Sequence, residues 1–177
     1  MNIRETIPAD IKDILHVERE AFQRDSEANI TRDMLSDLSA EPCVSLLAFV
    51  ENQPVGLILF TRGYIEGNPR IGVSFLAPLA VIPKFQKRGI GGALIKEGIK
   101  RLSKIGVDLI FVIGHPEYYP RFGFTPALKL GFQPTYPLPH EVADAWMVLA
   151  LRSDIIGVIS GKVICCDVMN KPEVWHQ

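Results

Sequence analysis

A short loop that combines glycines with basic residues is the part of the sequence best suited to chemistry. Residues 79–92 read Leu-Ala-Val-Ile-Pro-Lys-Phe-Gln-Lys-Arg-Gly-Ile-Gly-Gly. An apolar, strand-like run from Val73 to Ile82 ends at Pro83, and a helical pattern of apolar residues follows the glycines. Free amides at a helix start point toward an anion, and the helix dipole favours its charge. A strand, a glycine loop and a helix start in this order therefore predict a phosphate site.

Two familiar phosphate loops do not fit this spacing. A Walker loop requires two glycines five apart, followed by Lys and Ser or Thr, and that pattern is absent. A dinucleotide fingerprint requires Gly-x-Gly-x-x-Gly, but here Leu94 follows Gly89 and Gly91 at the third place. Four predicted strands also precede the loop, whereas a dinucleotide loop opens its fold. The spacing that fits is Gln-x-x-Gly-x-Gly, beginning at Gln86.

The longer string Leu-x-Val-x-Pro-x-x-Gln-x-x-Gly-Ile-Gly resembles the GNAT superfamily of N-acetyltransferases, in which this loop carries the pyrophosphate of acetyl-CoA. The resemblance implies acetyl-CoA as co-substrate and no metal. We expect the main contacts to come from backbone amides between Lys87 and Gly92, with side-chain charge from Lys87 and Arg88. A plain strand-to-helix turn is the alternative interpretation. The residues expected to bind the coenzyme are Leu79, Ala80, Val81, Gln86, Lys87, Arg88, Gly89, Ile90, Gly91 and Gly92.

The strand that leads into the loop contains Pro78. Because proline removes a ladder hydrogen bond, it predicts a bulge or a sheet edge. The resemblance implies that this strand splays from its neighbour. The pantetheine arm of the coenzyme would then pair with its free backbone groups as an added strand. Leu79, Ala80 and Val81 would line the arm and the thioester.

A second signature lies farther along, where Tyr119, Gly123 and Phe124 match the GNAT pattern Tyr-x-x-x-Gly-Phe. The longer string Tyr-Tyr-x-Arg-Phe-Gly-Phe resembles the YhbS-like branch. We expect Tyr119 to protonate the departing CoA thiolate, because a tyrosine hydroxyl near pKa 10 is a suitable donor. Tyr118 should point about 100° away on a helix and is assigned to packing or to the acceptor. A backbone amide near Val81 would polarise the thioester carbonyl.

The acceptor amine arrives as an ammonium ion and must lose a proton. His115 stands where a buried strand should end, near the thioester, and is the named candidate base. A water chain without a dedicated base is equally compatible with the sequence. The other conceivable bases are Glu18, Glu20, Glu27, Glu66 and Glu117.

The periodicity of apolar residues predicts an α/β fold, of the α+β mixed-sheet kind, with a sheet of mixed direction. The resemblance implies the GNAT-like acyl-CoA N-acyltransferase fold with a splayed central strand. The predicted helices are 8–22, 31–38 and 89–105, with 23–29 as a loop. The predicted strands are 2–7, 44–51, 54–65, 72–82, 107–113 and 145–151.

The composition bounds the organisation of the chain. With 177 residues, 47% of them hydrophobic, residues 1–152 can form one N-acetyltransferase domain. Residues 153–177 are expected to form a C-terminal extension, with a hairpin around Ser160-Gly161 that completes the sheet or makes a dimer contact. A formal net charge of −1 argues against broad surfaces for nucleic acid or membranes. Three cysteines without metal spacing, and a start without an apolar stretch, predict a cytoplasmic protein.

The sequence thus predicts transfer of an acetyl group to a primary amine of a small molecule or protein, by direct attack in a ternary complex. In this fold the first two helices usually shape the acceptor pocket, so Asp25 or Glu27 could hold a cationic amine. Tyr64, His140 and Trp146 could form walls. The alternative function is a non-catalytic acyl-CoA-binding or sensor module of the same fold. A homodimer is left open.

Overall fold

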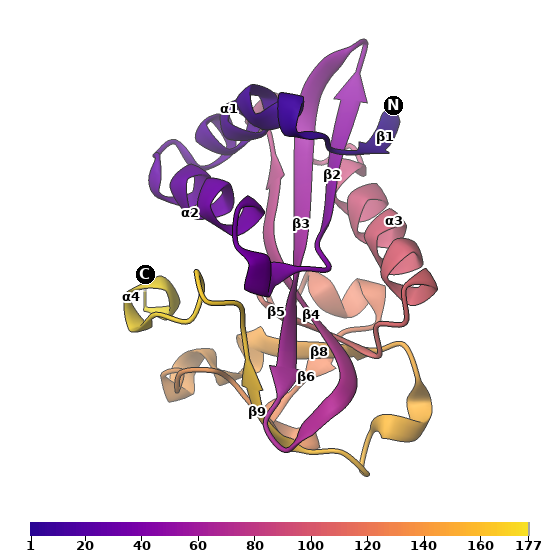
Figure 1. Cartoon of the computed structure of the whole chain (residues 1–177). Coiled ribbons are helices and arrows are strands. Elements are labelled where there is room, and N and C mark those ends of the chain that lie inside the picture. The colour runs from indigo at the N-terminus through magenta and orange to yellow at the C-terminus, as the bar shows by residue number, and fades with distance from the viewer. Residues whose placement is uncertain (177) are drawn as a thin grey trace.

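A nine-stranded sheet of mixed direction organises the molecule, and the computed structural model describes residues 1–176 (Figure 1). The main path of neighbouring strands is β1-β2-β3-β4-β5-β8-β6, and β9 joins it through β3 and also pairs with β7. The strands are β1 (Asn2–Glu5), β2 (Val44–Val50), β3 (Gln53–Ile65), β4 (Asn68–Val81), β5 (Leu109–Ile113), β6 (Thr125–Pro126), β7 (Phe132–Gln133), β8 (Trp146–Ala150) and β9 (Gly161–Ile164). The predicted mixed α/β fold is confirmed.

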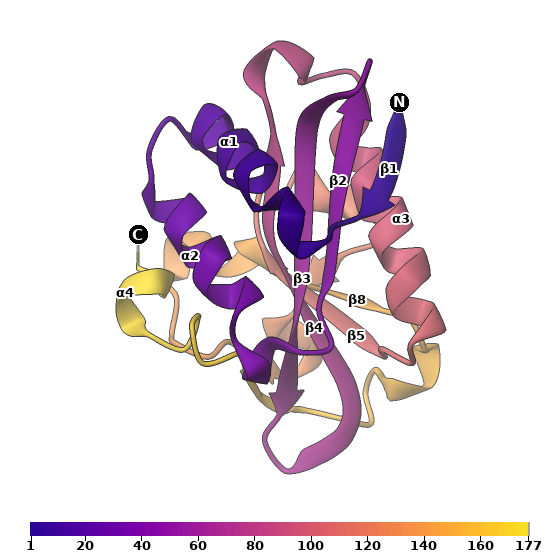
Figure 2. The ribbon, with the colours of Figure 1, turned by 45° about the horizontal axis from the view of Figure 1, so that its top comes forward.

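Three helices cover the sheet from its two sides. α1 (Ile11–Phe22) and α2 (Ser26–Leu35) lie on one side, and α3 (Ile90–Lys104) lies on the other (Figures 1 and 2). Each presents an apolar stripe, so Ile14 and Val17 of α1 are buried, as are Leu94 and Leu102 of α3. A short helix, α4 (Pro172–Trp175), lies near the C-terminus.

The beginning of α2 corrects one prediction. Residues 23–29 were expected to form a loop, but α2 begins at Ser26 and ends at Leu35. The apolar pattern hid this start because only Ala28 is buried in the first turn, while Glu27 brings a carboxylate that favours a helix N-terminus. The loop between α1 and α2 is therefore short, covering residues 23–25.

The structure of the C-terminal segment differs from the prediction as well. The hairpin predicted around Ser160-Gly161 does not form in residues 153–176, where β9 is the strand that the structure describes. β9 pairs antiparallel with β3, at Tyr64↔Ile164 and Ile65↔Val163, and parallel with β7. Val163 of β9 is buried in one cluster with residues of β4, β5 and β8, a contact that an isolated hairpin would lack. The dimer contact and the division at residue 152 stay predictions.

The central strand β4 separates from its parallel neighbour β5 part-way along its length. The two strands pair from Val73 to Phe75 in β4 and from Leu109 to Phe111 in β5. β4 then continues to Val81 with β3 as its strand partner among the described residues. The register with β3 shifts at Ala77-Pro78, which is the bulge that proline predicted. The splayed strand is thus confirmed, and it leaves one edge of β4 open.

Candidate active site

The glycine loop presents a row of unpaired main-chain donors. Lys87 has φ 61° and Gly89 has φ 82°, so two left-handed residues turn the chain into α3. The first intrahelical bond in this region runs from the Ala93 amide to the Gly89 carbonyl. Within residues 1–176, the six amides from Lys87 to Gly92 donate no hydrogen bond. Six convergent donors at a helix start form an anion site.

A groove of about 1020 Å³ runs from this loop to the splayed part of β4. Leu79 and Val81 line it from β4, and Tyr118 and Phe122 close its other side. Of the residues expected to bind the coenzyme, those lining the groove are Leu79, Val81, Gln86, Lys87, Gly89, Ile90, Gly91 and Gly92. Its walls are therefore partly apolar, and its polar end is the amide row.

Three of the expected coenzyme-binding residues have contacts that sequence alone did not indicate. The Gln86 side-chain amide donates to the Val81 carbonyl at 2.9 Å and so ties the loop to the end of β4. The Arg88 guanidinium lies over the Phe85 ring, 5.2 Å from its centroid. Ala80 is 2% exposed and packs in the core. The cationic side chains that line the groove are those of Lys87, Lys96 and Arg121, and Arg88 is not among them.

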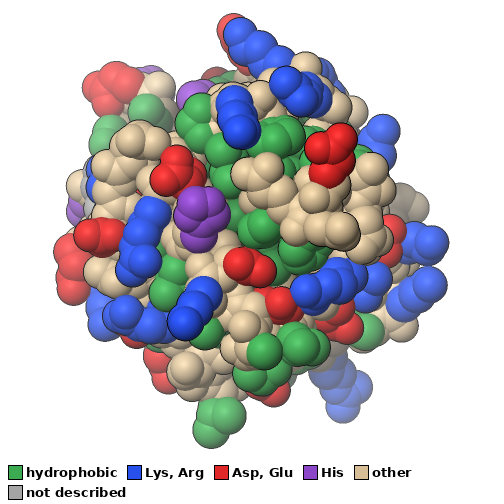
Figure 3. All heavy atoms as spheres, turned by 90° about the horizontal axis from the view of Figure 1, so that it is seen from above, with side chains coloured by type: hydrophobic (Ala, Val, Ile, Leu, Met, Phe, Trp, Pro, Cys, Tyr) green, Lys and Arg blue, Asp and Glu red, His purple; other side chains and the backbone are tan. Residues whose placement is uncertain are grey.

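Charge on the face seen in Figure 3 is mixed. Lys and Arg side chains alternate with Asp and Glu side chains around a patch of apolar ones. A polyanionic ligand would therefore be attracted by local donors rather than by a broad basic surface.

The two adjacent tyrosines occupy different environments. Tyr119 begins a 3₁₀ helix (Tyr119–Phe122) and is 7% exposed, packed edge-on against Phe124 at 5.6 Å between ring centroids. Any side chain at Gly114 would collide with the Tyr119 ring. Burial raises the pKa of Tyr119 well above its usual value of 10. In the described part of the chain its hydroxyl makes no hydrogen bond, yet it is not among the fully enclosed unpaired oxygens. The Tyr119 hydroxyl thus remains protonated, but Tyr119 is not among the residues that line the groove.

Tyr118 lines the groove beside the glycine loop, a position that the sequence did not predict. A Cβ atom at Gly91 would lie 2.8 Å from the Tyr118 hydroxyl, so the phenol reaches the first turn of α3. The Arg121 guanidinium lies over the Tyr118 ring, 4.5 Å from the ring centroid. Burial, the larger effect, raises the pKa of Tyr118, while the positive charge of Arg121 opposes the rise. Gly91 and Tyr118 lie 27 residues apart in the sequence, so their contact gives no local signal.

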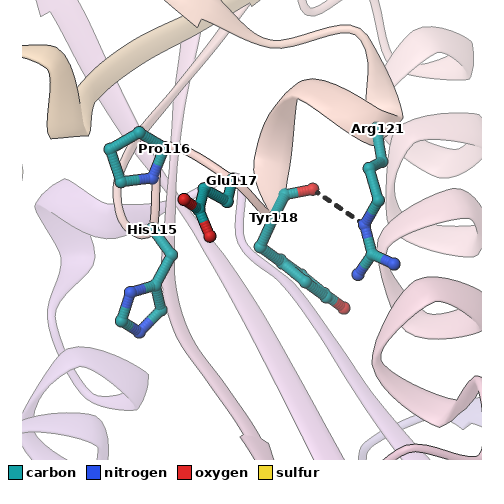
Figure 4. Close-up of a pocket in the computed structure, with 5 residues that line it drawn as sticks. All are labelled: His115, Pro116, Glu117, Tyr118 and Arg121. Atoms are coloured by element: carbon teal, nitrogen blue, oxygen red, sulfur yellow. Dashed lines mark hydrogen bonds between the residues drawn. The ribbon is translucent and has the colours of Figure 1, made fainter.

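His115 lies beside the groove in a smaller cavity of about 390 Å³. Figure 4 shows its imidazole and the Tyr118 phenol pointing to different sides of the loop, with the Arg121 Nε donating to the Tyr118 carbonyl at 3.3 Å. The His115 carbonyl accepts hydrogen bonds from the Tyr118 and Tyr119 amides. The backbone of His115 therefore positions both tyrosines, and its role as a base stays a prediction.

A second pocket, of about 280 Å³, lies where β4 and β5 part, and Ala77 and Pro78 of β4 contribute to it. Leu79 and Val81 contribute to the coenzyme groove. We call the second cavity the far pocket. Its lining residues are Glu27, Ile30, Thr31, Met34, Ala77, Pro78, Ile113, Met169, Val174 and Trp175. Glu27 was anticipated from sequence, whereas the rest come from segments too far apart to form a pattern.

The remaining acceptor-side candidates are occupied elsewhere. Trp146 is fully buried, and its indole donates to the Phe132 carbonyl at 2.9 Å, so it is a core residue. Asp25 pairs with Arg19 at 2.9 Å on the surface. Tyr64 stands on β3 opposite β9. None of these three lines the far pocket.

This geometry agrees with a family match. Residues 9–124 match the model of the Acetyltransferase (GNAT) family. The chain belongs to this family, whose members are acetyl-CoA-dependent acyltransferases, and the predicted enzyme class is confirmed.

Individual relatives support the assignment. The chain is 42% identical over 166 residues to the uncharacterized N-acetyltransferase YjhQ of Escherichia coli K12, covering 92% of this chain and 90% of that protein. The crystal structure of the GNAT family N-acetyltransferase YhbS from Escherichia coli in complex with CoA has a TM-score of 0.86 at 27% identity, covering 96% of this chain and 92% of YhbS. A GNAT acetyltransferase from Brucella melitensis in complex with acetyl-CoA has a TM-score of 0.75 at 28% identity, covering 95% and 97%.

One further finding concerns membranes. Among residues 1–176 there is no helix with the length and apolar character needed to cross a bilayer.

Proposed function

We propose that this protein transfers the acetyl group of acetyl-CoA to a primary amine of a small molecule or protein by direct attack in a ternary complex. The observation that carries the proposal is the row of six unpaired amides from Lys87 to Gly92 at the mouth of a groove that follows the open edge of β4. The structural neighbours in complex with CoA and acetyl-CoA support the choice of ligand.

In this proposal the amide row binds the diphosphate, and Lys87 adds charge beside it. The open edge of β4 from Leu76 to Val81 hydrogen-bonds the amide groups of the pantetheine arm, which orients the thioester between the parting strands. Leu79 and Val81 exclude water from the arm. Positioning of two reactants supplies most of the rate enhancement, since no covalent intermediate is required.

The chemical step has a balanced course. The neutral amine nitrogen forms a bond to the thioester carbon, and a main-chain amide near Val81 stabilises the resulting oxyanion. Collapse breaks the carbon–sulfur bond and expels the thiolate, and the extra proton on nitrogen leaves to a base. Tyr119 donates its hydroxyl proton toward the departing sulfur. Its hydroxyl is protonated at neutral pH, and because burial raises its pKa it gives up its proton only to a strongly basic group such as the departing thiolate.

The base that deprotonates the amine is His115 or a chain of water molecules. His115 stands at the end of β5, the strand that borders the splay.

The experiment that tests the function has two parts. Acetyl-CoA should raise the melting temperature of the protein, while ATP and NAD should not, because the amide row fits a diphosphate joined to a pantetheine arm. A thiol-release assay with a broad panel of primary amines should then find turnover. Stabilisation by ATP or NAD alone would contradict the ligand assignment. Binding of acetyl-CoA without any turnover would favour the acyl-CoA sensor instead.

Two attributes complete the proposal. We expect a cytoplasmic protein, to be checked by cell fractionation. A homodimer stays a prediction, to be checked by light scattering.

A further inference from the structure

The far pocket meets the coenzyme groove at the splay. Pro78 lines the far pocket, and the next residue, Leu79, lines the groove. Ala77 lines the far pocket as well, because the bulge at Ala77-Pro78 interrupts the alternation of the strand, so the two cavities adjoin the same short segment of β4. At this level β4 no longer pairs with β5, so that edge of β4 is open beside both cavities. A thioester held in the groove therefore presents its carbonyl to whatever the far pocket holds.

Most of the far pocket's wall is apolar and comes from opposite ends of the chain. Ile30 and Met34 of α2 face Met169, Val174 and Trp175 of the C-terminal segment. Trp175 is itself 8% exposed, fixed by a hydrogen bond from its indole to the Met169 carbonyl at 2.9 Å. A wall of this kind accommodates an apolar group and excludes a second charge, since burying an unpaired charge is costly. The volume of 280 Å³ limits the occupant to a small molecule.

The polar groups of the far pocket are acidic or hydroxylic, and its lining contains no Lys or Arg. Glu27 contributes a carboxylate, but it is already paired with Arg24 and accepts a hydrogen bond from Ser26, so its charge is neutralised before a second ammonium could enter. Thr31 contributes a hydroxyl that donates to Glu18 Oε1 at 2.7 Å. Glu18 is 0% exposed, and its other oxygen, Oε2, has no hydrogen-bond partner within the described residues.

This hydrogen bond leaves the Thr31 oxygen able to accept. A hydroxyl has one donor and two acceptor sites, and Glu18 uses the donor. A buried carboxylate behind an acceptor oxygen favours a cationic or N–H-rich group in front of it. The apolar lining residues therefore favour a molecule with an apolar body, and the Thr31 oxygen favours an amine at one end of it.

We propose that the far pocket binds the acceptor as a small primary amine carried on an apolar body, with the body against Val174 and Trp175 and the amine at Thr31. The inference rests on the proposed function for its reaction and narrows that function to one substrate class. Thr31 contacts the amine, and Glu18 acts through Thr31 as a positioning residue.

Two amines of similar length but opposite far ends test the inference. Phenethylamine ends in an apolar ring, whereas putrescine ends in a second ammonium. With acetyl-CoA in excess, we expect kcat/KM for phenethylamine to exceed that for putrescine at least roughly tenfold, because the far pocket would bury putrescine's second charge. Equal values, or a preference for putrescine, would overturn the inference while leaving the acetyltransferase function intact.

Three variants locate the two ends of the occupant. Thr31→Val should lower kcat/KM for phenethylamine by about tenfold, and Thr31→Ser should retain it, because only serine keeps the hydroxyl. Val174→Asp should lower the phenethylamine value and leave putrescine unaffected. Retained acetyl-CoA binding and melting temperature establish that each variant is folded. Wild-type rates in Thr31→Val, or equal losses for both amines in Val174→Asp, would contradict the assignment.

A binding measurement separates the two proposals. Calorimetric titration of phenethylamine into the CoA-loaded protein should saturate, and Val174→Asp should abolish the heat. Saturation without turnover of any amine would support the pocket and refute catalysis. Turnover of other amines without phenethylamine binding would refute the pocket and support catalysis.

Discussion

The coenzyme groove and the far pocket share the strand β4 but are built in different ways. The polar end of the groove is formed by the main-chain amides of consecutive residues 87–92. Its geometry follows from two residues with left-handed backbone conformation just before a helix. The far pocket is lined by side chains from α2, β4, β5 and the C-terminal segment. Main-chain recognition is local in sequence and tolerant of side-chain change, whereas the far pocket depends on how distant elements pack. The coenzyme should therefore be common to relatives, and the acceptor specific to this chain.

The largest expected effect is on the groove. Gly91→Trp should weaken acetyl-CoA binding by at least roughly 1,000-fold, about 4 kcal/mol, because an indole at Gly91 would fill the groove that this residue lines. Lys100→Trp, at an exposed position of the same helix, is the matched control. Calorimetry measures both affinities. Tight binding by the Gly91 variant would mean that the coenzyme does not approach α3.

The next effect is on the side of the far pocket, through Glu18. Burial raises the pKa of this carboxyl from 4.5 to about 7, opposed by the hydrogen bond from Thr31 and reinforced by the nearby Glu27. The folded state then binds a proton more tightly than the unfolded state. Stability therefore falls as pH rises from about 4.5 to 7, by up to roughly 3 kcal/mol. Glu18→Gln should flatten this part of the profile.

Urea unfolding between pH 5 and pH 8 measures that difference. Asp10 offers an internal contrast, because its hydrogen bonds from Arg4 hold its pKa at about 2 despite burial. Its contribution is present above pH 4 and is lost only as pH falls toward 2. An unchanged slope in Glu18→Gln would show that Glu18 is ionised in the folded protein throughout.

Variants of the two adjacent tyrosines test which of them donates the proton to the departing thiolate. Tyr119→Phe should lower kcat roughly 100-fold with little change in stability, because its hydroxyl makes no hydrogen bond within residues 1–176. Tyr118→Phe is the matched control and should change kcat less than about threefold. The measurement is steady-state thiol release. The reverse pattern would assign the proton donor to Tyr118.

The smallest effect separates main-chain from side-chain recognition in the groove. Lys87→Asn keeps a residue that tolerates the left-handed φ of 61°, and should weaken acetyl-CoA binding about three- to tenfold at low salt. Arg88→Ala should do less, because that guanidinium lies on Phe85. Affinity measured at low and high salt tests this. A hundredfold loss in either variant would mean that side chains, not amides, hold the diphosphate.

Sequence alone predicted those parts of the molecule whose causes are local. Pro78 predicted the bulge, and the spacing of Gln86, Gly89 and Gly91 predicted the loop, because backbone geometry limits which residues can occupy these positions. Tyr118 was assigned to packing or to the acceptor because a helix was assumed, whereas the chain between Pro116 and Gly123 forms only a 3₁₀ turn and Tyr118 lines the groove.

The features that sequence could not predict depend on contacts between distant segments. The apolar pattern of β9 is compatible with a hairpin inside the tail, but in the structure β9 pairs with β3 instead. Thr31 and Glu18 are unremarkable in a helical pattern until α1 and α2 bring them to 2.7 Å. Trp175 reaches the far pocket from the end of the chain, so no spacing rule connects it with Pro78.

The amide row itself is open to direct observation by NMR. In a titration with acetyl-CoA, the backbone amide protons from residue 87 to residue 92 should shift downfield together, since each gains an anionic acceptor. The amides of the far pocket should move little until an amine is added. Saturable binding that left those six amides unshifted would contradict the account at its centre.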